Sequence, residues 1–176
     1  MPAGMTLAFG SYADAKRMEG FEQEVRHAEV PVSEAMIAFF CSLIEDGNPS
    51  YWDPAFAEKW WGALVAPPAM VNVWLMPLPW RPQGADLRPS IALSVPLPGS
   101  VLINVAIDVE YERHVRLGDR LSSIERVDRV GPEKRTRLGV GHFIDSSARI
   151  HNQDGHLIAT HKNTLFRYEP DATGSR

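Results

Sequence analysis

The second half of the chain constrains the fold most strongly, because it reads as a series of strands. From residue 101 onward, stretches rich in Val, Ile and Thr are separated by short turn signals. These signals are Leu117-Gly118-Asp119, Gly131-Pro132-Glu133 and Asn152-Gln153-Asp154-Gly155. We expect four strands, at about 101–116, 120–130, 135–151 and 156–168. Because short connections make neighbouring strands antiparallel, the sequence predicts an antiparallel meander.

A long apolar helix is expected before these strands. Ser33 is a suitable N-cap, and the residues that follow it to Ile44 are apolar nearly all round. The helix should end near Gly47, because Pro49 prevents its continuation. A helix with so little polar surface must be covered by other structure. The expected fold class is therefore α+β, with one antiparallel sheet wrapped around a long central helix.

Other segments have weaker signals. A second helix should begin at the Asp53 N-cap with Pro54 and stop at Gly62. A helical segment at 66–75 should end before Pro77, and a long loop should follow to residue 100, with six prolines between 76 and 100. We expect residues 1–30 to form an arm or short helix, 31–169 a single domain and 170–176 a disordered tail.

Composition excludes several classes of protein. A net charge of −4 over 176 residues offers no basic footprint for nucleic acid. No stretch approaches the roughly 20 apolar residues that cross a membrane, and no basic, apolar leader begins the chain. The single cysteine, Cys41, lies in an apolar stretch and fits a reducing compartment. We therefore expect a cytoplasmic protein that binds neither nucleic acid nor membranes.

The residues after the apolar helix carry the most specific motif. They read Asp46-Gly47-Asn48-Pro49-Ser50-Tyr51-Trp52-Asp53, and Ala66-Pro67-Pro68 follows a little later. This stretch resembles the hydratase motif of MaoC-like hot-dog proteins, which is Asp-x-Asn-Pro-x-His-x-Asp. In that family the Asp and His position and deprotonate a water that attacks the β-carbon of an enoyl thioester. A backbone N–H nearby stabilises the enolate that develops.

Two departures from the family motif affect its chemistry. Tyr51 occupies the His position, and a phenol with an ordinary pKa of about 10 is a poor base at neutral pH. Pro67 and Pro68 stand where active relatives have His-Gly, and proline has no N–H to donate. The candidate catalytic residues Asp46 and Tyr51 therefore form a degenerate site. We expect a partner chain to supply the working Asp and His.

A wider resemblance, over about residues 30 to 168, suggests the substrate and the partner. Its residues include Ala66 to Met70, Val130 to Lys134 and Leu138 to Ile144. These are similar to the MaoC-like domain of the large subunit of the steroid side-chain enoyl-CoA hydratase. The resemblance implies a lyase subunit that hydrates a steroid or other bulky 2-enoyl-CoA. It also implies a smaller catalytic MaoC-like partner in a heterotetramer of two heterodimers, with no cofactor, since coenzyme A is part of the substrate.

Several residues have both a binding and a structural interpretation. Asn48, Trp52, Trp74, Pro67 and Pro68 are candidate substrate contacts. Turn residues such as Asn48 are also common for backbone reasons, and aromatics at helical spacing are more often core or interface.

Charged and histidine residues in the strands also have two interpretations. Arg126, Lys134 and Arg135 are candidate contacts to coenzyme A phosphates, although they also suit a solvated hairpin. We set aside a metal site at His151, His156 and His161, because no carboxylate or cysteine cluster completes it.

Two alternative functions remain open. The chain could be a self-sufficient homodimeric hydratase or dehydratase in which Asp46 acts with a perturbed Tyr51. It could instead be a non-catalytic acyl-CoA-binding module.

Overall fold

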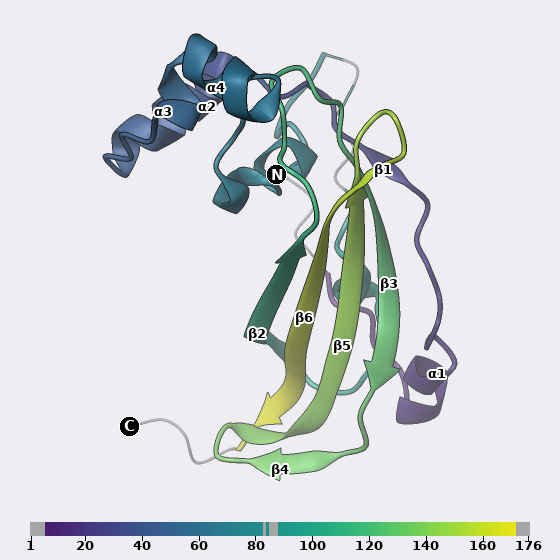
Figure 1. The fold of residues 1–176 in the computed structure, drawn as a ribbon. Coiled ribbons are helices and arrows are strands. Elements are labelled where there is room, and N and C mark those ends of the chain that lie inside the picture. The colour runs from purple at the N-terminus through teal and green to yellow at the C-terminus, as the bar shows by residue number, and fades with distance from the viewer. Residues whose placement is uncertain (1–5, 83, 85–87, 172–176) are drawn as a thin grey trace.

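The centre of the molecule is one antiparallel sheet, seen in a computed structural model that describes residues 6–82, 84 and 88–171. The strand order is β1-β3-β5-β6-β2, and the short β4 pairs with β5 (Figure 1). The strands are β1 (Arg26–His27), β2 (Val101–Tyr111), β3 (Ser122–Val130), β4 (Lys134–Thr136), β5 (Gly139–His151) and β6 (Leu157–Pro170). The predicted antiparallel sheet is confirmed.

The prediction of a simple meander is wrong for β2. In sequence β2 is followed by β3, but in the sheet it pairs with β6, where Val109 lies opposite His161. The chain between β2 and β3 instead crosses the end of the sheet. There the N–H of Leu117 donates to the Leu64 carbonyl, and that of Gly118 donates to the Val32 carbonyl. A turn signal gives a change of direction, but it does not determine which strand becomes the neighbour.

The hairpin between β5 and β6 follows the local sequence closely. Asn152 accepts hydrogen bonds at Oδ1 from the N–H groups of Asp154 and His156, and Gly155 has a φ of 75°. The strand predicted at 135–151 is two strands, because the chain turns at Arg137 and Leu138, and β5 then begins at Gly139 with a φ of 140°. Only a glycine adopts that φ readily.

The helices are short. They are α1 (Tyr12–Lys16), α2 (Glu34–Leu43), α3 (Pro49–Trp52), α4 (Pro54–Trp61) and α5 (Ile91–Ser94), with 3₁₀ turns η1 (Pro68–Met70) and η2 (Val73–Leu75). The predicted α4 is confirmed, with Asp53 as N-cap and Gly62 left-handed at its end. The helix expected at 66–75 is instead two 3₁₀ turns. The loop expected at 76–100 contains α5.

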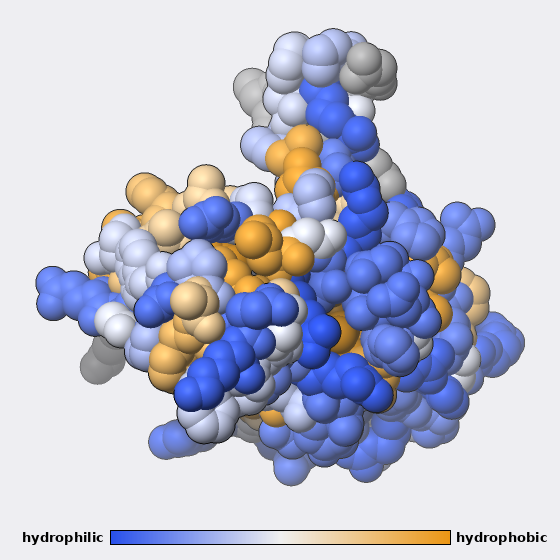
Figure 2. Space-filling view, turned by 45° about the horizontal axis from the view of Figure 1, so that its top comes forward, coloured by the Kyte–Doolittle hydropathy of each residue, from blue (hydrophilic) through white to orange (hydrophobic). Residues whose placement is uncertain are grey.

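Helix α2 forms where the apolar stretch predicts it, but this chain covers only one side of it. Ile37 and Cys41 are fully buried, whereas Phe39 and Leu43 are each 67% exposed. The helix lies with α3 and α4 at one end of the sheet (Figure 1). Figure 2 shows apolar residues at the molecular surface. The apolar pattern showed that the helix needs cover, but it could not show which chain provides it.

Two hydrophobic clusters lie on the sheet. One joins α2 and α4 to the ends of β5 and β6 through residues such as Cys41, Ile150 and Ala159. The other packs α1 and α5 on β3 and β5 through residues such as Ile91 and Ile144.

Across the described ranges, no helix is long and apolar enough to cross a membrane. Residues 1–5 and 172–176, in the predicted arm and tail, lie outside those ranges.

Candidate active site and sheet pocket

The polar residues of the motif are engaged in capping the turns after α2. Asp46 accepts a hydrogen bond at Oδ1 from the N–H of Asn48, at 3.0 Å. Asn48 in turn accepts one from the N–H of Ser50, at 3.0 Å, and so caps α3. Asp53 accepts from two N–H groups at the start of α4. The motif is therefore satisfied as a structural element without any ligand.

Tyr51 is unsuited to the role of the family histidine. Its side chain is half-buried beside the motif, and burial raises the pKa of the phenol above its ordinary value. The negative charge of Asp46 raises this pKa further. Within the described residues, no hydrogen bond joins the Tyr51 hydroxyl to Asp46. At neutral pH the phenol remains protonated, so it cannot deprotonate a water.

The other predicted substrate contacts are placed separately. Trp52 is half-exposed and donates its indole N–H to the Asp46 carbonyl at 2.7 Å. Trp74 is only 1% exposed and belongs to the core, with its indole N–H unpaired. Pro67 is buried and Pro68 exposed at η1, where two backbone N–H donors are absent. The structure places Trp52 beside Asp46 and Trp74 in the core.

The predicted phosphate contacts have other partners. Arg126 lies 3.6 Å from Asp128, and Arg135 lies 3.1 Å from Asp171. Lys134 lies over the ring of Phe143, 5.5 Å from its centroid. Lys134 and Arg135 are on β4, at the opposite end of the sheet from α2, α3 and α4 (Figure 1). The structure therefore does not bring Lys134 and Arg135 close to the Asp-x-Asn-Pro motif.

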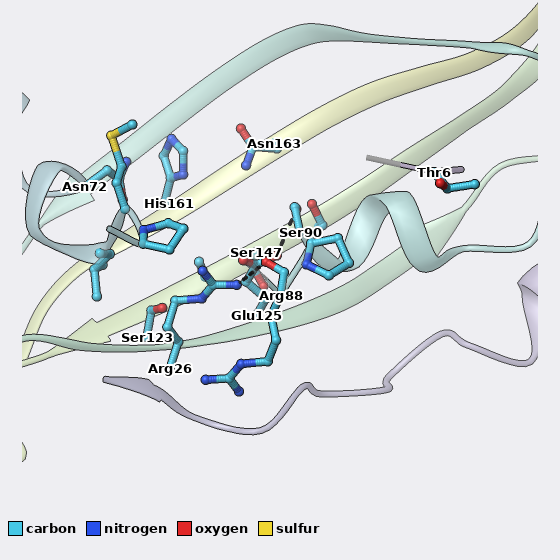
Figure 3. A pocket seen from close by; sticks show the side chains of 16 residues that line it. Thr6, Arg26, Asn72, Arg88, Ser90, Ser123, Glu125, Ser147, His161 and Asn163 are labelled. Atoms are coloured by element: carbon cyan, nitrogen blue, oxygen red, sulfur yellow. Dashed lines mark hydrogen bonds between the residues drawn. The ribbon is translucent and has the colours of Figure 1, made fainter. Parts of the chain in front are cut away.

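A cavity of about 650 Å³ lies elsewhere, over one face of the sheet, and we call it the sheet pocket. Its floor is formed by residues of three strands: Ser123 and Glu125 of β3, Ser146 and Ala148 of β5, and His161 and Asn163 of β6 (Figure 3). Segments 72–77 and 88–90 form further walls. None of the motif residues lines it. This pocket was not predicted from the sequence.

Glu125 and His161 are the titratable groups of the pocket floor. Glu125 accepts two hydrogen bonds at Oε2, from the Ser90 hydroxyl at 2.9 Å and the Ile91 N–H at 2.8 Å. Burial lowers the pKa of His161, and the negative charge of Glu125 opposes that shift. The imidazole is therefore neutral at pH 7. In the described parts of the chain, no group of three or more His, Cys, Asp or Glu side chains could hold a metal.

One signal in the sequence could have revealed the floor. Because alternate residues of a strand share a face, polar side chains two apart on a buried face are unusual. The pairs Ser123 and Glu125, and His161 and Asn163, have this spacing. From the sequence, His161 is considered only as a possible metal ligand, because the sequence does not show which distant strands pair.

Helix α2, the Asp-x-Asn-Pro turn after it and the single antiparallel sheet are the features that resemble hot-dog proteins of the hydratase and dehydratase class. Residues 19–161 match the family described as "FAS1-like, dehydratase domain region", and the chain belongs to this MaoC-like family. The predicted hot-dog fold and family are confirmed.

Two relatives are named as hydratase alpha subunits. The "Probable enoyl-CoA hydratase alpha subunit" of Thermomonospora curvata is 32% identical over 158 residues, covering 85% of this chain and 49% of the relative. The "3-oxo-4,17-pregnadiene-20-carboxyl-CoA hydratase alpha subunit" of Mycobacterium tuberculosis is 38% identical over 124 residues, covering 68% and 40%. The chain therefore spans half or less of the length of these relatives.

Solved structures agree on the fold. A chain of the ChsH1-ChsH2 complex from Mycobacterium tuberculosis superposes with a TM-score of 0.72 and 26% identity, covering 93% of this chain and 92% of that one. The R-hydratase PhaJ1 from Pseudomonas aeruginosa superposes with a TM-score of 0.55 and 19% identity, covering 86% and 82%. The second likeness is evidence of the shared fold alone.

Proposed function

We propose that the chain is one subunit of a heteromeric 2-enoyl-CoA hydratase whose catalytic Asp and His belong to a second, smaller MaoC-like chain. The observation that carries this proposal is Tyr51 at the family histidine position, with its pKa raised by burial and by Asp46. The loss of two N–H donors at Pro67 and Pro68 points the same way. The relatives named as alpha subunits support a role beside another subunit.

The reaction needs groups that this chain lacks. In hydration the oxygen of water bonds to the β-carbon of the enoyl thioester, while a base takes a proton from that water. A proton is delivered to the α-carbon, so that one H₂O adds across the double bond and gives the 3-hydroxyacyl-CoA. The partner's Asp and His supply the base and the acid. Coenzyme A is part of the substrate, and the proposal requires no further cofactor.

The contribution of this chain is to hold a bulky acyl group. The sheet pocket, at about 650 Å³, lies within the range of cavities of roughly 300–1,000 Å³ that take drug-sized ligands. A steroid side-chain thioester is the substrate we propose, in line with the pregnadiene carboxyl-CoA named for one relative.

The partner is proposed to cover the apolar surface that this chain leaves exposed. Phe39, Leu43 and Ile44 are all more than half exposed at the helical end. The edge strand β2 exposes Val105 and Ile107 as well. An uncovered edge and an exposed apolar surface are typical of chains that associate. Two such pairs would form the heterotetramer.

The experiment is a turnover assay with and without the partner. The purified chain is given crotonyl-CoA and a steroidal 2-enoyl-CoA, and loss of the enoyl thioester absorbance is followed. We expect no turnover above background until a MaoC-like chain with an intact Asp-x-Asn-Pro-x-His motif is added. Brisk turnover by the chain alone would support the self-sufficient homodimer instead. Binding of acyl-CoA with no turnover beside any such partner would support the non-catalytic binding module.

A further inference from the structure

The sheet pocket has a polar floor at a place where the sheet would otherwise continue its hydrophobic core. Along β5, the side chains on this face are, in order, Ile144, Ser146, Ala148 and Ile150. The two outer residues belong to the two hydrophobic clusters, and the two inner ones line the pocket. The interruption is therefore confined to the stretch of strand under the cavity.

The neighbouring strand β6 has the same interruption. His161 and Asn163 line the pocket, between Ala159 in one cluster and Leu165 packed against the other. Ala148 of β5 lies opposite His161, and Ser146 lies opposite Asn163. Polar residues on two adjacent strands thus form a continuous patch rather than isolated substitutions.

Much of the hydrogen-bonding capacity of this patch is unused by the protein. Within the described residues, the side chains of Ser123, Ser146 and His161 make no hydrogen bond to another group of the chain. Asn163 accepts one bond from Asn104, at 3.3 Å, and its amide N–H₂ has no acceptor there. Ser123 and Ser146 are each only 6% exposed, so these groups face the cavity rather than open solvent.

We infer that the floor of the sheet pocket selects an acyl group carrying a ketone or hydroxyl oxygen on its apolar body, with Ser146, His161 and Asn163 as its hydrogen-bond partners. This inference rests on the proposed function and specifies its substrate class. Leu75, Met76 and Pro77 provide apolar contacts for the body of the ligand.

The preference for an oxygen-bearing acyl group follows from the displacement of water from the pocket. An all-hydrocarbon group that fills the cavity displaces water and leaves the polar floor unpaired, which costs free energy. An oxygen atom at the floor replaces the water's hydrogen bonds. A neutral imidazole can donate to a ketone through one ring nitrogen, and it can also accept from a hydroxyl through the other.

The test compares two ligands that differ by one oxygen. Steroid 20-carboxyl-CoA thioesters with saturated side chains, one 3-oxo and one 3-deoxy, are titrated calorimetrically into the full chain. The chain is used in complex with its partner where one copurifies. We expect the 3-oxo ligand to bind at least about tenfold more tightly.

Variants of two residues in the sheet pocket test whether its floor causes the preference for the 3-oxo ligand. His161→Phe and Ser146→Ala, tested separately, should reduce the ratio to about threefold or less by weakening the 3-oxo ligand alone. His156→Phe, at an exposed position outside the pocket, should leave the ratio unchanged. Thermal unfolding of each variant identifies any that fails to fold, and either pocket variant is sufficient for the test.

The outcomes separate the two proposals. Equal binding of both ligands by the unaltered protein, or an unchanged ratio in the folded pocket variants, overturns the oxygen preference and leaves the proposed function intact. Failure of both ligands to bind overturns the inference and removes the acyl pocket from the proposed function as well.

Discussion

Replacing Glu125 by alanine should destabilise the protein by about 2–4 kcal/mol. Glu125 is the group that ties α5 and its N-terminal segment to the sheet beside the pocket. Its carboxylate accepts from the Ser90 hydroxyl at 2.9 Å and from the Ile91 N–H at 2.8 Å. Hydrogen bonds to a charged group contribute about 1.5–3 kcal/mol each. Ile91 is fully buried, so its N–H would find little water in the variant.

The assay is urea unfolding, supported by thermal melting. For a protein of this size the expected loss corresponds to a fall in Tm of roughly 5–15 °C. Glu125→Gln keeps one acceptor oxygen, so its free energy of unfolding should lie between those of the unaltered protein and Glu125→Ala. Glu133→Ala, at an exposed site in a turn, is the control and should change stability by less than about 0.5 kcal/mol. Were Glu125→Ala no more destabilising than the control, the reasoning about this anchor would be wrong.

Three further predictions concern the sheet, the surface and the pocket. Gly141→Ala places a Cβ against the Arg167 carbonyl oxygen and 2.6 Å from the Cα of Tyr168 on β6, and should cost at least about 1–3 kcal/mol in urea unfolding. Gly47→Ala, with open space around it, should not. Phe39→Glu should weaken assembly with the catalytic partner at least about tenfold by calorimetry, and Arg137→Glu, at an exposed position in the turn between β4 and β5, much less. Because burial lowers the pKa of His161 in the folded protein, the unfolded chain takes up that proton first as pH falls. The contribution of neutral His161 to the free energy of unfolding should be complete above about pH 6.5 and should decline as pH falls through the lowered pKa. His161→Phe should remove that part of the decline in stability.

The parts of the fold that could be predicted are those with local causes. Asp53, Pro54 and Gly62 bound α4 through contacts within a few residues, so their signal is complete in the sequence. The hairpin at Asn152 is local in the same sense. In contrast, α5 is capped by Glu125, which is 34 residues away from Ile91. No local pattern could have shown that contact.

The candidate site also has one part with a local signal in the sequence and one part that depends on distant contacts. The replacement of histidine by Tyr51 could be read directly from the motif, and the structure adds the burial that keeps its phenol protonated. The spacing of polar residues along single strands indicates a polar face, but the position of the sheet pocket could not be predicted, because its floor depends on which strands are neighbours. Ser123, Ser146 and His161 meet only because β5 lies between β3 and β6, an order that turn signals do not specify.

The central claim is that the catalytic groups lie outside this chain, and a comparison of kcat/KM in the assembled hydratase tests it most directly. Asp46→Asn combined with Tyr51→Phe is measured beside replacement of the partner's motif histidine by alanine. We expect the first complex to retain kcat/KM within about twofold and the second to lose about 10²–10⁴-fold. A comparable loss on removing Asp46 and Tyr51, with the histidine variant still active, would contradict the claim.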